Sequence, residues 1–312
     1  MRNILIMKIA ALGDIVRTTP ILHKFKNDSI TWFTSEKGTH LLKNNPYIKR
    51  VLTEKSLNEA HDTYYDIVLN MDEELECCIL ATSLMNHNKV KEFYGFYADN
   101  GFINYKGKDT DWLDISLSGK FNKEKADDPR WKNKADELKW HNRRSYEDHM
   151  FSILGFKFNG EEYILNYEVN TKKGFVGIQN PLERNTKWPM KQWNNYESLA
   201  TEIKKLGYEV RFLGLKISLE EHINDIAECE YVICEDSLPM QIATALKKPT
   251  IALFICTSPY EIHSYNRVTK IVSPKLKEYF YRRDFDPKAA ETIPLKTVME
   301  AFKNVVNNNT SI

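Results

Sequence analysis

Asp14 is a carboxylate that we expect to lie at a ligand-binding site. It follows Gly13 in the segment after the first predicted strand, Ile4–Lys8. Thr19 and Pro20 are a typical N-cap and first helical residue, so a helix is predicted to begin at Pro20. The preceding loop is then about ten residues long, against the usual ~2–6, and we expect it to present Asp14 to a ligand. The alternative is that Asp14 only caps a turn.

Two later stretches offer groups that could bind a diphosphate. Lys187 precedes Trp188 in a segment that also contains Arg184, and an ammonium group there could neutralise a departing phosphate. Asp236 and Ser237 precede a helical run, and a helix N-terminus binds anions through its amide groups and dipole. The alternatives are a solvated Lys187 beside a packed tryptophan, and an Asp-Ser cap that binds no ligand.

Two series of alternating strand-like and helix-like segments must position these residues. Such alternation predicts an α/β fold with parallel sheets, and its occurrence twice predicts two Rossmann-like domains facing a cleft. Ligands of such sheets bind at the carboxyl ends of the strands. The predicted strands lie near Ile4–Lys8, Ile30–Thr34, Arg50–Thr53, Asp66–Asn70, Val90–Gly95, Phe175–Gln179, Glu209–Leu213, Tyr231–Cys234, Ile251–Phe254 and Lys270–Val272.

The predicted boundary lies in a polar stretch, which divides the chain into domains 1–168 and 169–312. Each half has about 150 residues, a usual domain size. An insertion of about residues 104–144 interrupts the first domain. Between Lys120 and Arg144 it holds nine Lys and Arg against five Asp and Glu, together with Trp131 and Trp140. We expect this segment either to hold an anionic acceptor or to be a solvated helical insertion whose tryptophans pack on the domain.

Composition limits the class of protein. Lys and Arg number 44 and Asp and Glu 43, so the whole molecule is not built to coat nucleic acid or anionic lipid. The five cysteines show no CxxC spacing and the eight histidines no ligand spacing, which predicts no zinc and no disulfide. No secretory signal is visible and no stretch reaches the ~20 apolar residues of a membrane span. We expect a cytoplasmic protein with at most peripheral contact with the inner membrane.

Four stretches resemble motifs of one family, in the same order. They are Lys8–Pro20, with Leu-Gly-Asp at its centre, then Thr186–Trp193, Asp236–Leu246 and Lys248–Phe254. Together they resemble glycosyltransferase family nine, the heptosyltransferases of the lipopolysaccharide inner core. The resemblance implies a GT-B fold and an inverting, metal-independent transfer without a cofactor. It also implies a nucleotide-sugar donor in the second domain and an anionic glycan or protein acceptor in the first.

The resemblance also implies roles for individual residues. Asp14 would be the catalytic base, and Lys187 would neutralise the diphosphate. Glu261 resembles a residue of the family's loop near the nucleotide and could accept ribose hydroxyls. The implied donor-binding residues are Gly13, Arg184, Thr186, Lys187, Asp236, Ser237, Leu238, Gln241 and Glu261. The candidate acceptor-binding residues are Arg17 and, from the positive charge of the insertion, Lys132, Lys134 and Lys139.

The sequence departs from the family pattern at three positions. Leu238 stands where the family has glycine, Gln241 where it has histidine, and Arg17 where many relatives have histidine. Autotransporter relatives bind iron through cysteines near the C-terminus, but residues 273–291 contain none, so we expect no such metal. The favoured interpretation is transfer of heptose from ADP-heptose. A catalytically reduced nucleotide-sugar-binding protein of the same fold is the first alternative, and a nucleotide-sugar epimerase is the second.

Overall fold

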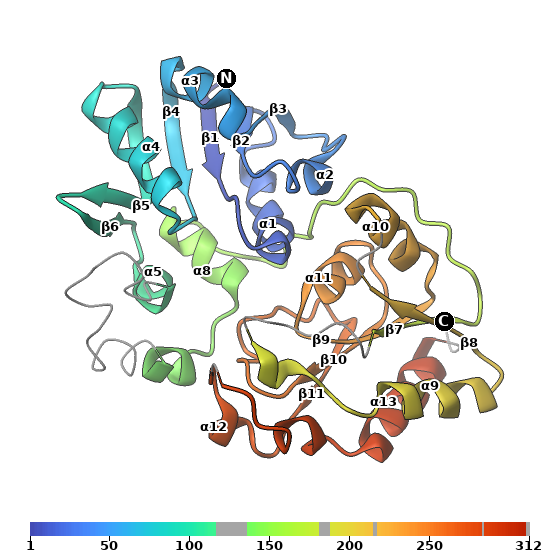
Figure 1. Cartoon of the computed structure of the whole chain (residues 1–312). Helices are drawn as coiled ribbons and strands as arrows, with labels where there is room; N and C mark the ends of the chain where they lie inside the picture. The colour runs from blue at the N-terminus through green and yellow to red at the C-terminus, as the bar shows by residue number, and fades with distance from the viewer. Residues whose placement is uncertain (117–135, 181–187, 215–216, 283, 310–312) are drawn as a thin grey trace. The chain divides into compact units, whose positions relative to one another are not determined.

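The structure is a computed structural model that describes residues 1–116, 136–180, 188–214, 217–282 and 284–309 (Figure 1). The chain divides into two compact units, Met1–Asn166 and Tyr167–Ile312. Each unit is built on its own sheet, in the α/β class that the alternating pattern predicts.

The first unit contains a six-stranded sheet in the order β3-β2-β1-β4-β5-β6. Both faces of the central strands are buried, and their sequences are therefore nearly continuous apolar runs. The strands β1 to β5 are parallel to their neighbours, and β6 is antiparallel to β5. The strands are β1 (Asn3–Met7), β2 (Ser29–Phe33), β3 (Ile48–Leu52), β4 (Tyr65–Asn70), β5 (Val90–Asp99) and β6 (Phe102–Lys106).

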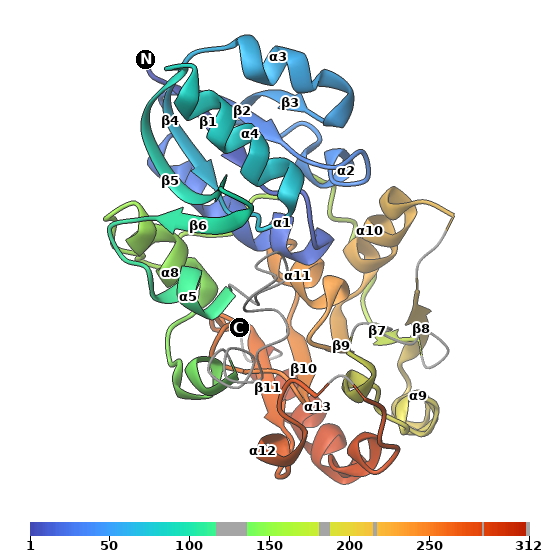
Figure 2. The same ribbon diagram turned by 60° about the vertical axis from the view of Figure 1, so that its left-hand side comes forward.

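Helices cover both faces of this sheet (Figure 2). Leu5 and Met7 share a buried core with residues of α4 such as Leu80. Ile4 and Ile6 are also fully buried, and the period of two along a strand turns them toward the other face. The helical segments of this unit are α1 (Leu12–Thr18), η1 (Thr19–Lys24), α2 (Thr39–Leu42), η2 (Glu54–Ser56), α3 (Leu57–Asp62), α4 (Leu75–Asn86), α5 (Asp111–Ser116) and α8 (Tyr146–Ile153).

The prediction that the first helix begins at Pro20 is wrong. Helix α1 begins at Leu12, so the connection after β1 has an ordinary length and Asp14 lies in the first helical turn. Pro20 instead lies at the start of η1, which follows α1 directly. The short α1 was hard to detect because its buried apolar residues are only Ile15 and Val16.

The second unit contains a five-stranded parallel sheet in the order β11-β10-β9-β7-β8. A buried core of this unit joins β7, β9 and β10 to α9 and α13 through residues such as Leu199, Ile233 and Phe302. The strands are β7 (Phe175–Gln179), β8 (Glu209–Leu213), β9 (Tyr231–Glu235), β10 (Thr250–Phe254) and β11 (Val268–Val272). The helical segments are η3 (Pro189–Lys191), α9 (Tyr196–Lys205), α10 (Leu219–Glu228), α11 (Leu238–Ala245), α12 (Leu276–Tyr279), η4 (Ala289–Glu291) and α13 (Leu295–Asn309).

The structure also shows the state of the cysteines and the character of the helices. All five cysteines are buried and free, and burial raises the pKa of thiols such as Cys229 to about 12. Among the helices of the described residues, none is long and apolar enough to cross a membrane.

Candidate active site

In the first unit the strand order reverses at β1, and this switch point marks one edge of the sheet as the candidate ligand-binding edge. β1 pairs with β2 on one side and with β4 on the other. In open α/β sheets, ligands bind outside the carboxyl ends of the strands at such a switch point. The loop after β1 leads into α1 and Asp14, and the loop after β4 carries Asp72 and Glu73. Both loops lie at this edge because the strands are parallel.

Asp14 is partly exposed at this edge. Its backbone N–H donates to the carbonyl of Ala11 at 2.8 Å, in the first turn of α1. One third of the Asp14 side chain is exposed, and its Oδ1 lies 2.9 Å from Nε of Arg17 in an ion pair. Arg17 is almost buried, and its guanidinium carbon lies 4.1 Å from the ring centroid of Tyr146. Arg17, the predicted acceptor contact, therefore faces Asp14 and Tyr146.

A buried ion pair behind Asp14 joins the two loops of the switch point. Nζ of Lys8 lies 3.3 Å from Oδ2 of Asp72 and donates to the carbonyl of Met71 at 3.0 Å. The same Oδ2 accepts the backbone N–H groups of Ile9 and Ala10 at 2.8 and 3.0 Å. Asp72 thus fixes the start of the connection that leads to Asp14.

Electrostatics keep this lysine charged. Burial disfavours the ammonium of Lys8, but the carboxylates of Asp72 and Asp14 outweigh it and raise its pKa above the ordinary value. The role of Lys8 and the presence of Asp72 in the site were missed from the sequence. The signal was there, because charged residues directly after two neighbouring apolar strands must meet at one edge.

Glu73 is a further carboxylate at this edge that sequence reasoning missed. It accepts a hydrogen bond from the hydroxyl of Ser116 at 2.9 Å. Burial raises the pKa of Glu73, while Lys8 and Lys139 oppose that rise. Lys139 is half-buried in the helical residues 136–141, so the structure places this predicted acceptor residue near the strand ends of the first unit. Lys132 and Lys134 lie outside the described residues.

The second unit has its switch point at β7, which pairs with β8 and β9. The chain leaves β7 at Asn180 and enters residues 181–187, which lie outside the described part of the chain. The predicted residues Arg184, Thr186 and Lys187 belong to that stretch. The loop after β9 carries Asp236 and Ser237, which lead directly into α11.

The N-terminus of α11 lacks a side-chain cap. Ser237 is the N-cap residue, but its hydroxyl donates to the carbonyl of Glu235 at 3.2 Å and caps no amide. Leu238 and Pro239 occupy the first two helical positions, and a helix leaves its first amides without intrahelical acceptors. Gln241 is 4% exposed, and its amide oxygen has no hydrogen-bond partner among the described residues. This end of α11 can therefore accept a polar or anionic ligand.

Glu261 lies in the loop after β10 and is 7% exposed. Its Oε1 accepts a hydrogen bond from the hydroxyl of Tyr281 at 3.1 Å. Trp188 packs edge-on against Tyr281 with ring centroids 5.1 Å apart.

Trp193 is fully buried and donates through Nε1 to the carbonyl of Ile293 at 2.8 Å. Trp193 is therefore a core residue.

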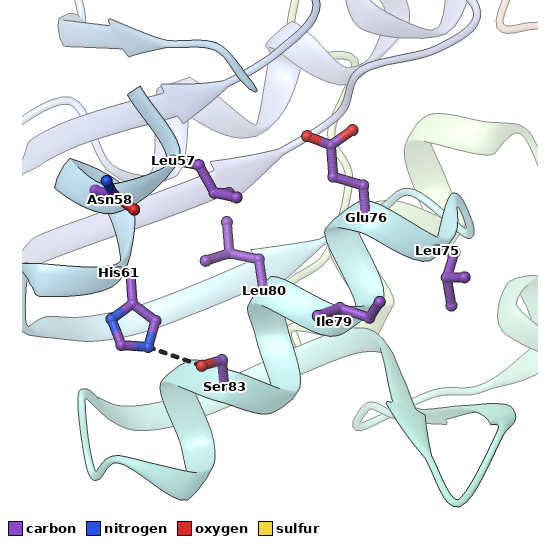
Figure 3. Close-up of a pocket in the computed structure, with 8 residues that line it drawn as sticks. All are labelled: Leu57, Asn58, His61, Leu75, Glu76, Ile79, Leu80 and Ser83. Carbon is purple, nitrogen blue, oxygen red and sulfur yellow. Dashed lines mark hydrogen bonds between the residues drawn. The ribbon is translucent and has the colours of Figure 1, made fainter. Parts of the chain in front are cut away.

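The first unit also contains a cavity that is separate from the residues around Asp14. It measures about 500 Å³ and lies between α3 and α4, where a hydrogen bond between His61 and Ser83 joins the helices at 2.7 Å (Figure 3). Its walls are mainly apolar, with Leu57 and Ile79 partly exposed. None of the predicted site residues lines it. In the described residues, no group of three or more His, Cys, Asp or Glu could hold a metal ion.

Comparison with known proteins agrees with the motifs. A model of glycosyltransferase family 9 (heptosyltransferase) matches residues 213–287. The chain is 25% identical to lipopolysaccharide heptosyltransferase 1 of Campylobacter coli, over 96% of this chain and 99% of that protein.

Two solved structures show the shared fold. A family 9 glycosyltransferase of Veillonella parvula matches with a TM-score of 0.61 at 15% identity, covering 98% of this chain and 97% of that one. The ADP-heptose lipopolysaccharide heptosyltransferase II of E. coli matches with a TM-score of 0.60 at 13% identity, covering 99% of each chain. The two sheets are those of a GT-B fold, and residues 213–287 of the chain are similar to glycosyltransferase family 9.

Proposed function

We propose that this protein is an inverting, metal-independent glycosyltransferase that transfers heptose from ADP-heptose to an anionic glycan or protein acceptor. The observation that carries the proposal is the partly exposed carboxylate of Asp14 at the switch point of the first sheet. The relatives named for ADP-heptose and lipopolysaccharide support this donor and a role in lipopolysaccharide biosynthesis. The cytoplasmic location stays a prediction.

The reaction would be an in-line displacement at the anomeric carbon of the donor. The acceptor oxygen forms a bond to that carbon while the bond from the carbon to the phosphate oxygen breaks, and the diphosphate leaves with the electron pair. Asp14 would take the proton of the acceptor hydroxyl. The uncapped amides of α11 would stabilise the leaving diphosphate together with Lys187. Gln241 and Glu261 would hydrogen-bond the rest of the donor.

The second candidate is a nucleotide-sugar-binding protein with reduced catalysis. Leu238 favours it, because a leucine side chain at the first position of α11 crowds a place where the family has glycine. The two functions differ in turnover. A protein that binds ADP yet never releases it from any sugar donor, with glycan or peptide acceptors present, has the second function.

The test is ADP release from ADP-heptose by the wild type and by Asp14→Asn. The substitution should abolish turnover, because an amide cannot take the proton, and should leave the Kd for ADP near the wild-type value. Calorimetry measures the Kd and a coupled assay the turnover. Activity should also survive exhaustive chelation with EDTA. Wild-type turnover by Asp14→Asn excludes Asp14 as the base, and loss with EDTA that magnesium or manganese restores excludes a metal-independent reaction.

A further inference from the structure

We infer that Arg17 is a positioning residue for Asp14, and that the rings of Tyr146 and Trp112 hold Arg17 in place. The inference rests on the proposed function, because it gives Asp14 the role of base. It goes further by assigning a task to three side chains that come from three separate helices, α1, α5 and α8.

The contact between Arg17 and Asp14 is not an ordinary surface ion pair. The two residues lie three positions apart on α1, with Nε and Oδ1 separated by 2.9 Å. Exposed pairs of this spacing contribute little, because long side chains lose freedom when they meet and solvent screens their charges. Here the Arg17 side chain is only 11% exposed, whereas that of Asp14 is 33% exposed. The guanidinium is therefore the fixed partner, and the carboxylate is the one that solvent can reach.

Two aromatic rings fix the guanidinium. Its central carbon lies 4.1 Å from the ring centroid of Tyr146 and 5.7 Å from that of Trp112, within the range of a cation–π interaction. The two rings meet edge to face, with centroids 5.0 Å apart. The hydroxyls of Tyr146 and Thr18 lie 2.8 Å apart, which ties the Tyr146 ring to the same helix that carries Asp14.

This arrangement restricts the direction of the Asp14 carboxylate and places a cation 2.9 Å from it. A cation within ~4–6 Å favours the charged form of a carboxylate. A base held in one direction also needs less reorganisation when the acceptor binds. Other charged or titratable groups act in the same region: Lys8 and Asp72 at the strand ends, Glu73 beside them, and the Tyr146 hydroxyl. Arg17 is distinguished from these groups by its direct contact with Asp14.

The experiment measures turnover of ADP-heptose as a function of pH in Arg17→Met and Arg17→Lys. Arg17→Met should lower kcat about 10- to 100-fold, the cost expected from a misplaced catalytic group. The acidic limb of its pH–rate profile should move to higher pH, because the neighbouring cation is gone. Arg17→Lys should recover part of both effects. The donor KM should not change, since the proposed donor residues other than Gly13 lie in the second unit.

The rings are tested through Tyr146. Tyr146→Phe keeps the ring face and should retain most of kcat. Tyr146→Leu removes the cation–π contact and should lower kcat and shift the acidic limb of the pH–rate profile as Arg17→Met does. Arg2→Met is a matched control, because Arg2 pairs with Asp28 at 2.7 Å and lies 5.7 Å from the ring of Phe25. Asp28 and Phe25 precede β2, at the opposite end of the sheet from Asp14. This control should leave kcat and the pH profile unchanged.

Carboxyl NMR separates this inference from the proposed function. In protein labelled with ¹³C at aspartate, the resonance missing from Asp14→Asn identifies Asp14, and its titration midpoint should rise in Arg17→Met even if no sugar is transferred. An unmoved midpoint in Arg17→Met overturns the inference whatever the activity. A higher acceptor KM with unchanged kcat and pH profile also overturns it, because Arg17 would then contact the acceptor directly. Absence of turnover in the wild type contradicts the proposed function alone.

Discussion

Lys191 and Asp236 join the loop after β7 to the loop after β9. Nζ of Lys191 lies 3.2 Å from Oδ2 of Asp236 and also donates to the carbonyl of the same residue. Burial disfavours the Lys191 ammonium, but Asp236 and Glu235 outweigh it and raise its pKa. The contact fixes Asp236, which directly precedes the N-cap of α11. It therefore stabilises the end of α11 that is proposed to bind the donor diphosphate.

Lys191→Met should lower the free energy of unfolding by about 1–3 kcal/mol, because it leaves a largely buried carboxylate and a carbonyl without their donor. Urea denaturation measures the change. Lys205→Met is the matched control, because Lys205 pairs with Glu202 at 2.7 Å on an exposed surface. The control should cost less than about 1 kcal/mol. Equal losses in the two variants would show that the Lys191 contact contributes no more than a surface pair.

Lys187→Ala should weaken binding of ADP by about 1.5–3 kcal/mol, the range for a hydrogen bond to a charged group. The physical reason is the loss of an ammonium that neutralises the diphosphate. Calorimetry measures the Kd, with Lys277→Ala in the exposed part of α12 as the control. A Kd equal to that of the wild type would make Lys187 a solvated lysine with no part in donor binding.

Replacing Lys132, Lys134 and Lys139 together with glutamine should raise the acceptor KM and flatten its dependence on salt. Charge contacts with an anionic acceptor are screened over about 8–10 Å at physiological ionic strength, so fewer lysines leave less to screen. Steady-state kinetics between low and physiological salt measure both quantities, and the donor KM serves as the internal control. If the acceptor KM and its salt dependence keep their wild-type values, the segment has a structural role.

His149 should make stability depend on pH. Burial, and then the charge of Arg144, lower the pKa of this histidine to about 4, against 6.5 for the ordinary side chain. The unfolded chain therefore takes up a proton between pH 6.5 and 4 while the folded protein does not. The stabilising contribution is complete above pH 6.5 and is lost as pH falls toward 4.

Between pH 7.5 and 4.5 this group should remove about 2–3 kcal/mol from the free energy of unfolding. Urea denaturation of the wild type and of His149→Gln measures the effect as the difference between the two pH dependences. Exposed His40→Gln is the control and should follow the wild type. Parallel curves for the wild type and His149→Gln would show that His149 does not carry the dependence.

Some of this protein could be predicted from its sequence because local patterns are enough to specify it. Apolar runs alternating with helical segments predict two parallel sheets, since a strand buried on both faces must be apolar throughout. The motif that begins at Asp236 predicted the start of α11, and the Leu-Gly-Asp motif made Asp14 the candidate base. Each of these features belongs to a single segment, and residues that are close in the sequence determine it.

Other features depended on residues that meet only after folding. Asp72 contacts Lys8 and the amides of Ile9 and Ala10 because parallel β1 and β4 bring their carboxyl ends to one edge, across more than 60 positions of sequence. Local sequence does not specify that pairing.

The surroundings of the predicted site residues were decided in the same way. The sequence predicts Arg17 as an acceptor contact, but in the structure its guanidinium lies against Tyr146, which is 129 positions away, and pairs with Asp14. In the sequence Lys191 is one of several basic residues near Lys187. In the structure it is largely buried and pairs with Asp236, directly before the N-cap of α11. Sequence patterns specify which segments form and which groups they carry. Tertiary packing decides which of those groups lie within ~3–4 Å of one another, and electrostatic effects at that range determine what each can do.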